Sequence, residues 1–121
     1  MAGTILIVDD STMIAGTLAA RLRAHGYEVM LAVDGQQGLE KAQREQPDLI
    51  LLDLMLPKLN GHEVCAMLKQ DARYQKIPIV MLTASLNAKD EQLAKECGAD
   101  TFLRKPVQPE QLLETVRRLV A

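Results

Sequence analysis

Polar side chains directly follow the apolar runs of strand length in this sequence. They are Asp9, Asp10, Asp53, Thr83 and Lys105. Carboxylates hold hard cations, and a hydroxyl and an ammonium group donate hydrogen bonds to phosphoryl oxygens. A carboxylate can also attack phosphorus and form an acyl phosphate. The residue types therefore predict phosphoryl chemistry, provided that the fold brings these five positions together.

Runs of strand length alternate with segments of helical periodicity along the chain, and turn or capping residues separate them. We expect strands at residues 4–8, 27–32, 48–52, 77–82 and 101–103. We expect helices at residues 12–25, 35–45, 61–70, 87–98 and from 109 onward. Strict βα alternation predicts an α/β fold, a doubly wound (βα)5 flavodoxin-like sandwich. The parallel sheet order 2-1-3-4-5 places the two most apolar strands, the first and the third, at its centre.

Ligands of such sheets bind beyond the carboxyl ends of the strands, where the strand order reverses. Taken singly, Asp10 or Asp53 would be a helix cap in about half of cases. Three crowded carboxylates are harder to explain as caps, because like charges repel unless a cation compensates them. Lys105 supplies one positive charge, which leaves the cluster anionic. An all-oxygen donor set favours Mg²⁺, completed by waters and a backbone carbonyl.

The composition sets limits on the function. The 121 residues are enough for one domain, residues 1–121. A net charge of −2 argues against direct nucleic-acid binding, and 2% aromatic residues argue against stacking of bases or flavins. Cys65 and Cys97 are expected to be small buried side chains rather than a disulfide or a metal site. With no signal peptide and no long apolar span, we expect a cytoplasmic protein without membrane contact.

Four segments together resemble the receiver domain of two-component response regulators, of the single-domain, chemotaxis-regulator kind. They read ILIVDDS, PDLILLDLMLP, IPIVMLTA and FLRKP. The resemblance spans the chain from Thr4 to the last helix. It implies that Asp53 accepts a phosphoryl group from a phosphohistidine on a sensor histidine kinase or a histidine phosphotransfer protein. It also implies that Asp9, Asp10, Asp53 and the backbone carbonyl of Met55 hold Mg²⁺.

The resemblance further implies a route from the phosphoryl group to a partner. Thr83 and Lys105 resemble the switch hydroxyl and the phosphate-binding lysine. When Thr83 moves toward the phosphoryl group, small Ala84 leaves room for the Phe102 ring to turn inward. Phe102 lacks a phenolic hydroxyl, so this switch would be purely steric; the alternative is a static core ring. Pro106 matches a position that has a cis peptide bond in the family.

Other functions remain open at this stage. A flavin-binding relative would share the fold, but Asp9 and Asp10 would repel its phosphate. An aspartate-nucleophile phosphohydrolase would need a general acid where Met55 stands. A receiver-like interaction module that works without phosphorylation is the remaining alternative. We expect no turnover of an external substrate. We expect a monomer that signals to a target protein or an output domain, and phosphorylation-linked dimerisation is the alternative to a monomer. The chain is either a stand-alone regulator or part of a longer protein.

Overall fold

A computed structural model describes residues 3–84 and 88–120 of the chain. The strands are β1 (Thr4–Val8), β2 (Glu28–Ala32), β3 (Leu49–Asp53), β4 (Ile79–Thr83) and β5 (Thr101–Arg104). The helices are α1 (Thr12–Ala24), α2 (Gly35–Glu45), α3 (Gly61–Lys69), α4 (Ala88–Glu96) and α5 (Pro109–Val120). Strands and helices alternate from the first element to the last, as the hydrophobic pattern predicted.

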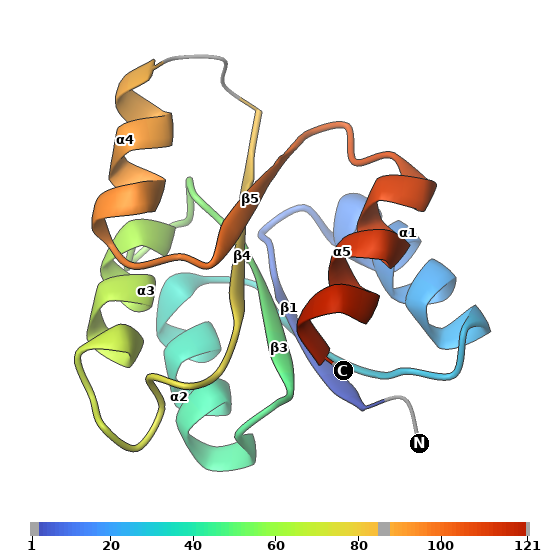
Figure 1. The fold of residues 1–121 in the computed structure, drawn as a ribbon, viewed down its shortest axis with the longest axis horizontal. Helices are drawn as coiled ribbons and strands as arrows, with labels where there is room; N and C mark the ends of the chain where they lie inside the picture. The colour runs from blue at the N-terminus through green and yellow to red at the C-terminus, as the bar shows by residue number, and fades with distance from the viewer. Residues whose placement is uncertain (1–2, 85–87, 121) are drawn as a thin grey trace.

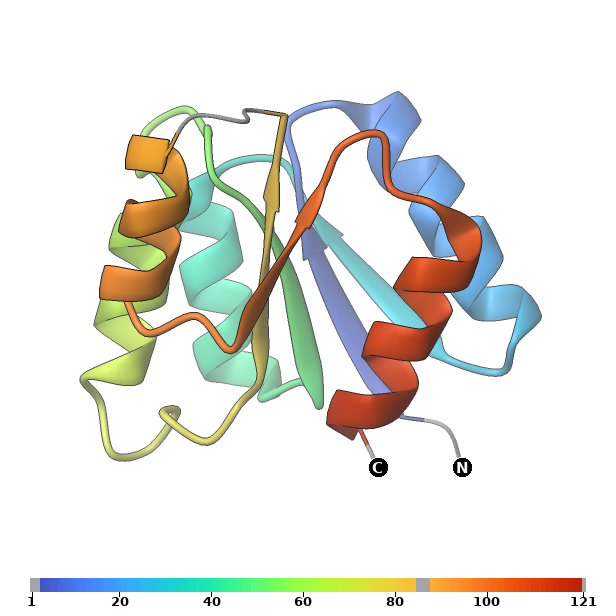
Figure 2. The same ribbon diagram turned by 45° about the horizontal axis from the view of Figure 1, so that its top comes forward.

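The strands form one parallel sheet in the order β2-β1-β3-β4-β5. Helices α2, α3 and α4 cover one face of this sheet, and α1 and α5 cover the other (Figures 1 and 2). This arrangement confirms the predicted fold class and strand order. The order reverses between β1 and β3, so the carboxyl ends of these two strands flank the place where such folds bind ligands.

Two apolar clusters, one on each face of the sheet, hold the layers together. Successive side chains of a strand point to opposite faces, so Leu6 and Val8 enter one cluster while Ile5 and Ile7 enter the other. All four are fully buried. Burial on both faces explains why the first strand is a continuous apolar run rather than an alternating one. The central strands are therefore a rigid platform for the residues at their ends.

Capping side chains fix where two of the helices begin. The hydroxyl of Ser11 accepts a hydrogen bond from the Ile14 amide at 3.3 Å and caps α1. The buried Asp34 carboxylate accepts a hydrogen bond from the Gln37 amide at 2.8 Å and caps α2. Each cap satisfies a backbone donor that the first turn of a helix leaves unpaired. The turns between strand and helix are thus held at the edge of the sheet where the polar residues gather.

Several element boundaries differ from the predicted ones by one or two residues. Asp53 and Thr83 are the last residues of β3 and β4, where the sequence predicted that the strands end one residue earlier. Both pair in register with a neighbouring strand, Asp53 with Leu82 and Thr83 with Arg104. Backbone pairing, not side-chain polarity, decides where a strand ends. The predicted start of the fourth helix at Asn87 lies outside the described residues.

Candidate functional site

The sheet brings all five polar positions to one edge. Asp9 and Asp10 follow β1, Asp53 ends β3, Thr83 ends β4, and Lys105 follows β5. Asp9, Asp53 and Thr83 are buried, with exposed fractions of 1%, 6% and 6%, while Asp10 is exposed. Polar side chains this deeply buried need partners within the fold or a bound ligand.

Lys105 supplies a partner for two of the carboxylates. Its Nζ lies 2.9 Å from Asp9 Oδ2 and 3.2 Å from Asp53 Oδ2. Burial works to lower the pKa of Lys105, but the hydrogen bond to Asp9 and the charges of both carboxylates outweigh burial and raise it. The ammonium therefore stays charged between the two acids. The backbone amide of Lys105 donates to the Thr83 carbonyl at 2.8 Å, which anchors the lysine to the end of β4.

The buried carboxylate of Asp53 has only partly compensating surroundings. Burial raises the pKa of the Asp53 carboxyl above its ordinary value, the charge of Lys105 opposes this rise, and the charge of Asp9 adds to it. Asp53 Oδ1 accepts a hydrogen bond of 3.3 Å from the amide of Met55, and Asp9 Oδ1 accepts one of 2.9 Å from the amide of Ser11. One ammonium and two backbone amides thus orient the two carboxylates without neutralising them completely.

Asp9, Asp10 and Asp53 form an oxygen cluster that fits a divalent cation. Each offers a carboxylate oxygen, and these oxygens lie within 4.8 Å of one another. Lys105 compensates only one of the three negative charges. Met55, two residues after Asp53, is 71% exposed at this edge. All-oxygen donor sets of this kind suit Mg²⁺, as expected from the sequence.

Gly35 and Gly61, the first residues of α2 and α3, lie so close to the backbone of the segment from Asp53 to Leu59 that neither can carry a Cβ, a constraint that the sequence did not reveal. A Cβ on Gly61 would lie 2.1 Å from the Asp53 carbonyl oxygen. A Cβ on Gly35 would lie 1.7 Å from the Leu59 carbonyl oxygen. The Gly61 amide donates to the Leu54 carbonyl at 3.0 Å. These contacts hold the segment that follows Asp53 against the sheet edge. From the sequence, Gly35 and Gly61 were expected only as the first residues of two helices.

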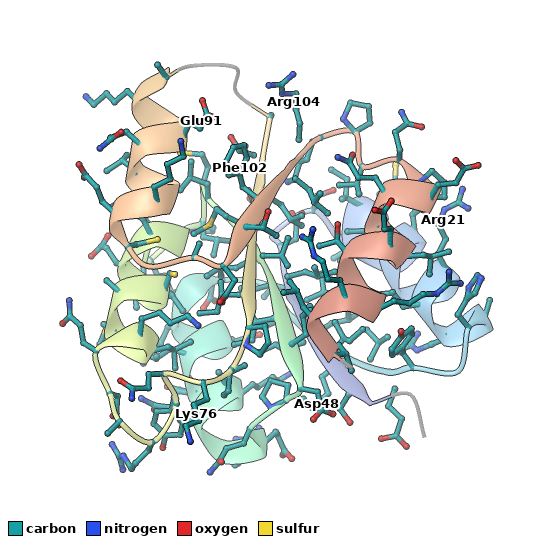
Figure 3. All side chains as sticks on the ribbon, in the orientation of Figure 1. Arg21, Asp48, Lys76, Glu91, Phe102 and Arg104 are labelled. Atoms are coloured by element: carbon teal, nitrogen blue, oxygen red, sulfur yellow. The ribbon has the colours of Figure 1, made fainter. Side chains whose placement is uncertain are left out.

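Thr83 and Phe102 lie on the same face of the sheet. Thr83 pairs with Arg104 and Met81 pairs with Phe102, so Phe102 is the diagonal neighbour of Thr83 across β4 and β5. Figure 3 shows Phe102 between β5 and α4, and Arg104 at the outer end of the strand. The ring is partly buried against the cluster that α2 and α3 cover.

Two further predicted positions lie at the same edge of the sheet. Ala84 follows Thr83 and is exposed. The Lys105–Pro106 peptide bond is cis. The predicted acids, Thr83, Ala84, Lys105 and Pro106 therefore lie along one edge of the sheet, from the end of β1 to the residues after β5.

The chain matches the family model described as the response regulator receiver domain over residues 5–117. The chain belongs to this family. Receiver domains are signalling modules of two-component systems, and their signalling depends on phosphorylation. Among the described residues, no helix combines the length and the apolar character needed to cross a bilayer.

Relatives of this receiver domain include two transcriptional regulators. The chain is 45% identical to the DNA-binding dual master transcriptional regulator RpaA of Synechocystis sp. over 116 residues, which are 96% of this chain and 48% of that protein. It is also 45% identical to the alkaline phosphatase synthesis transcriptional regulatory protein PhoP of Bacillus subtilis over 118 residues, again 96% and 48%. The receiver domain therefore spans about half the length of these relatives.

Solved structures resemble the receiver domain over nearly its whole length. The signal receiver domain of a signal transduction histidine kinase from Syntrophus aciditrophicus superposes with a TM-score of 0.92 at 34% identity, covering 98% of this chain and 89% of that one. The chemotaxis response regulator CheY4 of Vibrio cholerae superposes with a TM-score of 0.89 at 37% identity, covering 96% and 97%.

Proposed function

We propose that this receiver domain accepts a phosphoryl group on Asp53 in a reaction that requires Mg²⁺, and that Thr83 and Phe102 relay the change to a partner-binding face. The observation that carries the proposal is the meeting of three carboxylates, one ammonium and one threonine at a single edge of the sheet. The donor would be a phosphohistidine on a sensor histidine kinase or a histidine phosphotransfer protein, and the site would act in the cytoplasm.

Asp53 would be the acceptor because it is buried at the end of β3 and its carboxylate is oriented by the Met55 amide and the Lys105 ammonium. Its carboxylate oxygen attacks phosphorus, a phosphorus–oxygen bond forms, the phosphorus–nitrogen bond of the phosphohistidine breaks, and the electron pair returns to the imidazole. Burial destabilises the negative charge of the Asp53 carboxylate. Once the phosphorus–oxygen bond has formed, this charge is spread over the phosphoryl oxygens. Asp9 has the closer contact with Lys105, at 2.9 Å against 3.2 Å, which leaves Asp53 as the less tightly paired carboxylate.

Asp9, Asp10, Asp53 and the Met55 carbonyl would hold the magnesium ion. When bound, Mg²⁺ supplies positive charge to the acidic cluster and to the oxygens of the transferred group. Asp10 is exposed while Asp9 is almost completely buried, so Asp10 is the acid that reaches a ligand entering from solvent. Asp9 is instead fixed by the Lys105 ammonium and the Ser11 amide, and positions the others.

Lys105 and Thr83 would bind the phosphoryl group once it is on Asp53. The Lys105 ammonium already lies 3.2 Å from Asp53 Oδ2. The backbone amide of Lys105 donates a hydrogen bond to the Thr83 carbonyl, which fixes the start of the side chain. An ammonium and a hydroxyl donate charge-assisted hydrogen bonds to phosphoryl oxygens. Movement of Thr83 toward these oxygens would vacate space beside its diagonal neighbour Phe102, and Ala84 is too small to refill it. The ring would turn inward and change the face formed by α4, β5 and α5.

Intact mass measurement with a small phosphodonor tests the proposal. Incubation of the protein with Mg²⁺ and acetyl phosphate should add one phosphoryl group, and chelation of the metal should prevent the addition. Asp53→Asn should abolish it, whereas Glu114→Gln, an exposed acid-to-amide change on α5, should not. Failure of the protein to gain mass with any donor would instead favour an interaction module that works without phosphorylation.

A further inference from the structure

The two cysteines of the chain meet away from the acidic edge. Cys65 lies on α3 and is fully buried, and Cys97 directly follows α4 and is partly buried. The Cys65 thiol donates a hydrogen bond of 3.5 Å to the Cys97 carbonyl oxygen. Figures 1 and 2 show α4 alongside α3, and this packing brings together two cysteines that are 32 residues apart in sequence.

Charged and polar groups around the pair make the two thiols unequal. Lys69 Nζ lies 2.8 Å from Asp100 Oδ2 and also donates to the Ile77 carbonyl at 2.8 Å, so the ammonium has a fixed position. A hydrogen bond from Cys65 holds the pKa of Cys97 below its ordinary value despite burial, and the Ala99 amide and Lys69 assist. The same hydrogen bond and burial raise the pKa of Cys65. Burial points to the same difference in reactivity: Cys97 is partly exposed and can meet a reagent from solvent, whereas Cys65 is fully buried.

Such a pair has the two parts of a thiol-oxidation site. An accessible thiolate is the group that peroxides oxidise, and a second thiol beside it resolves the product as a disulfide. We propose that Cys97 reacts with a hydroperoxide and that Cys65 then closes a disulfide that fixes the end of α4 to α3. The site lies apart from Asp53, and its chemistry does not depend on phosphorylation.

The reaction balances with hydrogen peroxide as the oxidant. The Cys97 sulfur attacks one peroxide oxygen, the oxygen–oxygen bond breaks, and the hydroxide that leaves is protonated to water. Cys97 is then a sulfenic acid. The Cys65 sulfur attacks the Cys97 sulfur, the sulfur–sulfur bond forms, and hydroxide leaves with the Cys65 proton as a second water. Two thiols lose two electrons in total, and one peroxide is reduced to two waters.

Peptide mapping of the peroxide-treated protein tests the proposal without any variant. Trypsin releases Cys65 within residues 59–69 and Cys97 within residues 96–104. After treatment with hydrogen peroxide and alkylation, we expect these two peptides joined in one disulfide-linked species from monomeric protein, and separated after reduction. Before treatment, alkylation of the folded protein should label Cys97 and spare Cys65.

Two variants assign the roles of the cysteines. In Cys65→Ala the oxidation should stop at a sulfenic acid on Cys97, which a 1,3-dione reagent traps. In Cys97→Ala the buried Cys65 should stay reduced. Asp53→Asn should form the disulfide as readily as the unaltered protein, so failure of this proposal is distinguishable from failure of phosphorylation. Recovery of both thiols in reduced form after peroxide treatment, or disulfides only between two chains, would overturn the proposal.

Discussion

The ammonium of Lys105 lies 2.9 Å from Asp9 Oδ2, and the carboxylate of Asp9 is almost completely buried. The same ammonium also contacts Asp53 at 3.2 Å, so one positive charge serves two buried negative ones. A buried charge without a full counter-charge destabilises a fold unless a ligand compensates it. The acidic edge of the sheet is thus arranged for binding rather than for stability, and its stability should respond to pH and to metal.

Asp53→Asn should stabilise the protein at neutral pH in the presence of a chelator. The pKa of Asp53 is raised in the folded state, so the folded protein binds more protons than the unfolded chain between the two pKa values. Stability is then lost as pH rises through this window, by about 1.4 kcal/mol for each unit of pKa difference. Asp53→Asn has no carboxyl to titrate and does not lose this stability. Its higher free energy of unfolding should therefore disappear below the pKa that Asp53 has in the unfolded chain. Urea unfolding between pH 3 and pH 8 measures the difference.

Asp71→Asn is the matched control for this pH dependence. Asp71 lies in a surface turn and is partly exposed, and its hydrogen bonds from Arg73 lower its pKa. Its contribution has the opposite sign, because a carboxylate with a lowered folded pKa adds stability that is lost as pH falls. Solvent screening keeps that contribution small. If Asp53→Asn and Asp71→Asn had the same pH profile, the assignment of the effect to the buried acid would be wrong.

Mg²⁺ should raise the melting temperature of the protein, and a chelator should reverse the rise. A ligand that binds only the folded state stabilises it by about 2.7 kcal/mol at one hundred times its dissociation constant. Asp10→Asn removes the exposed carboxylate of the cluster and should abolish most of the rise, whereas Asp71→Asn should retain it. Calorimetric scans with and without Mg²⁺ measure the effect. An equal rise in both variants would place the metal elsewhere.

The sequence predicted the fold well because hydrophobic periodicity records which faces are buried. The continuous apolar run of β1 corresponds to a strand whose neighbouring residues, Ile5 and Leu6, enter opposite clusters. The predicted ends of the strands were less accurate than the predicted order of the elements. Asp53 and Thr83 are polar yet remain within their strands, since register with the neighbouring strand decides pairing. Polarity alone cannot locate that boundary.

The sequence predicted which polar residues the sheet brings to one edge, but not the contacts among them. The topology alone places residues that follow parallel strands at one edge, which is why the acids, Thr83 and Lys105 were found together. That Lys105 bridges Asp9 and Asp53 depends on side-chain reach, which no sequence pattern encodes. The meeting of Cys65 and Cys97 depends in the same way on how two helices pack against each other.

Gly61→Ala should destabilise the protein by about 3 kcal/mol, because the added Cβ would lie 2.1 Å from the Asp53 carbonyl oxygen and the backbone must shift. Gly16→Ala is the matched control. Gly16 lies inside α1 with no atom within 4 Å of the added Cβ, so alanine should stabilise the helix by about 0.5 to 1 kcal/mol. Urea midpoints of the two variants should therefore move in opposite directions. A urea midpoint of Gly61→Ala that does not fall would mean that the segment after Asp53 yields easily.

Phosphorylation should move the ring of Phe102, and this chain allows a clean measurement. Phe102 is the only phenylalanine, so 4-fluorophenylalanine labels a single position and gives one fluorine resonance. The resonance should shift on phosphorylation, because Thr83 and Phe102 are diagonal neighbours on the same face of the sheet. Thr83→Ala should accept the phosphoryl group without the shift, whereas Thr83→Ser, which keeps the hydroxyl, should retain it. A resonance that stays in place while the intact mass rises would identify Phe102 as a static core ring and exclude it from the relay.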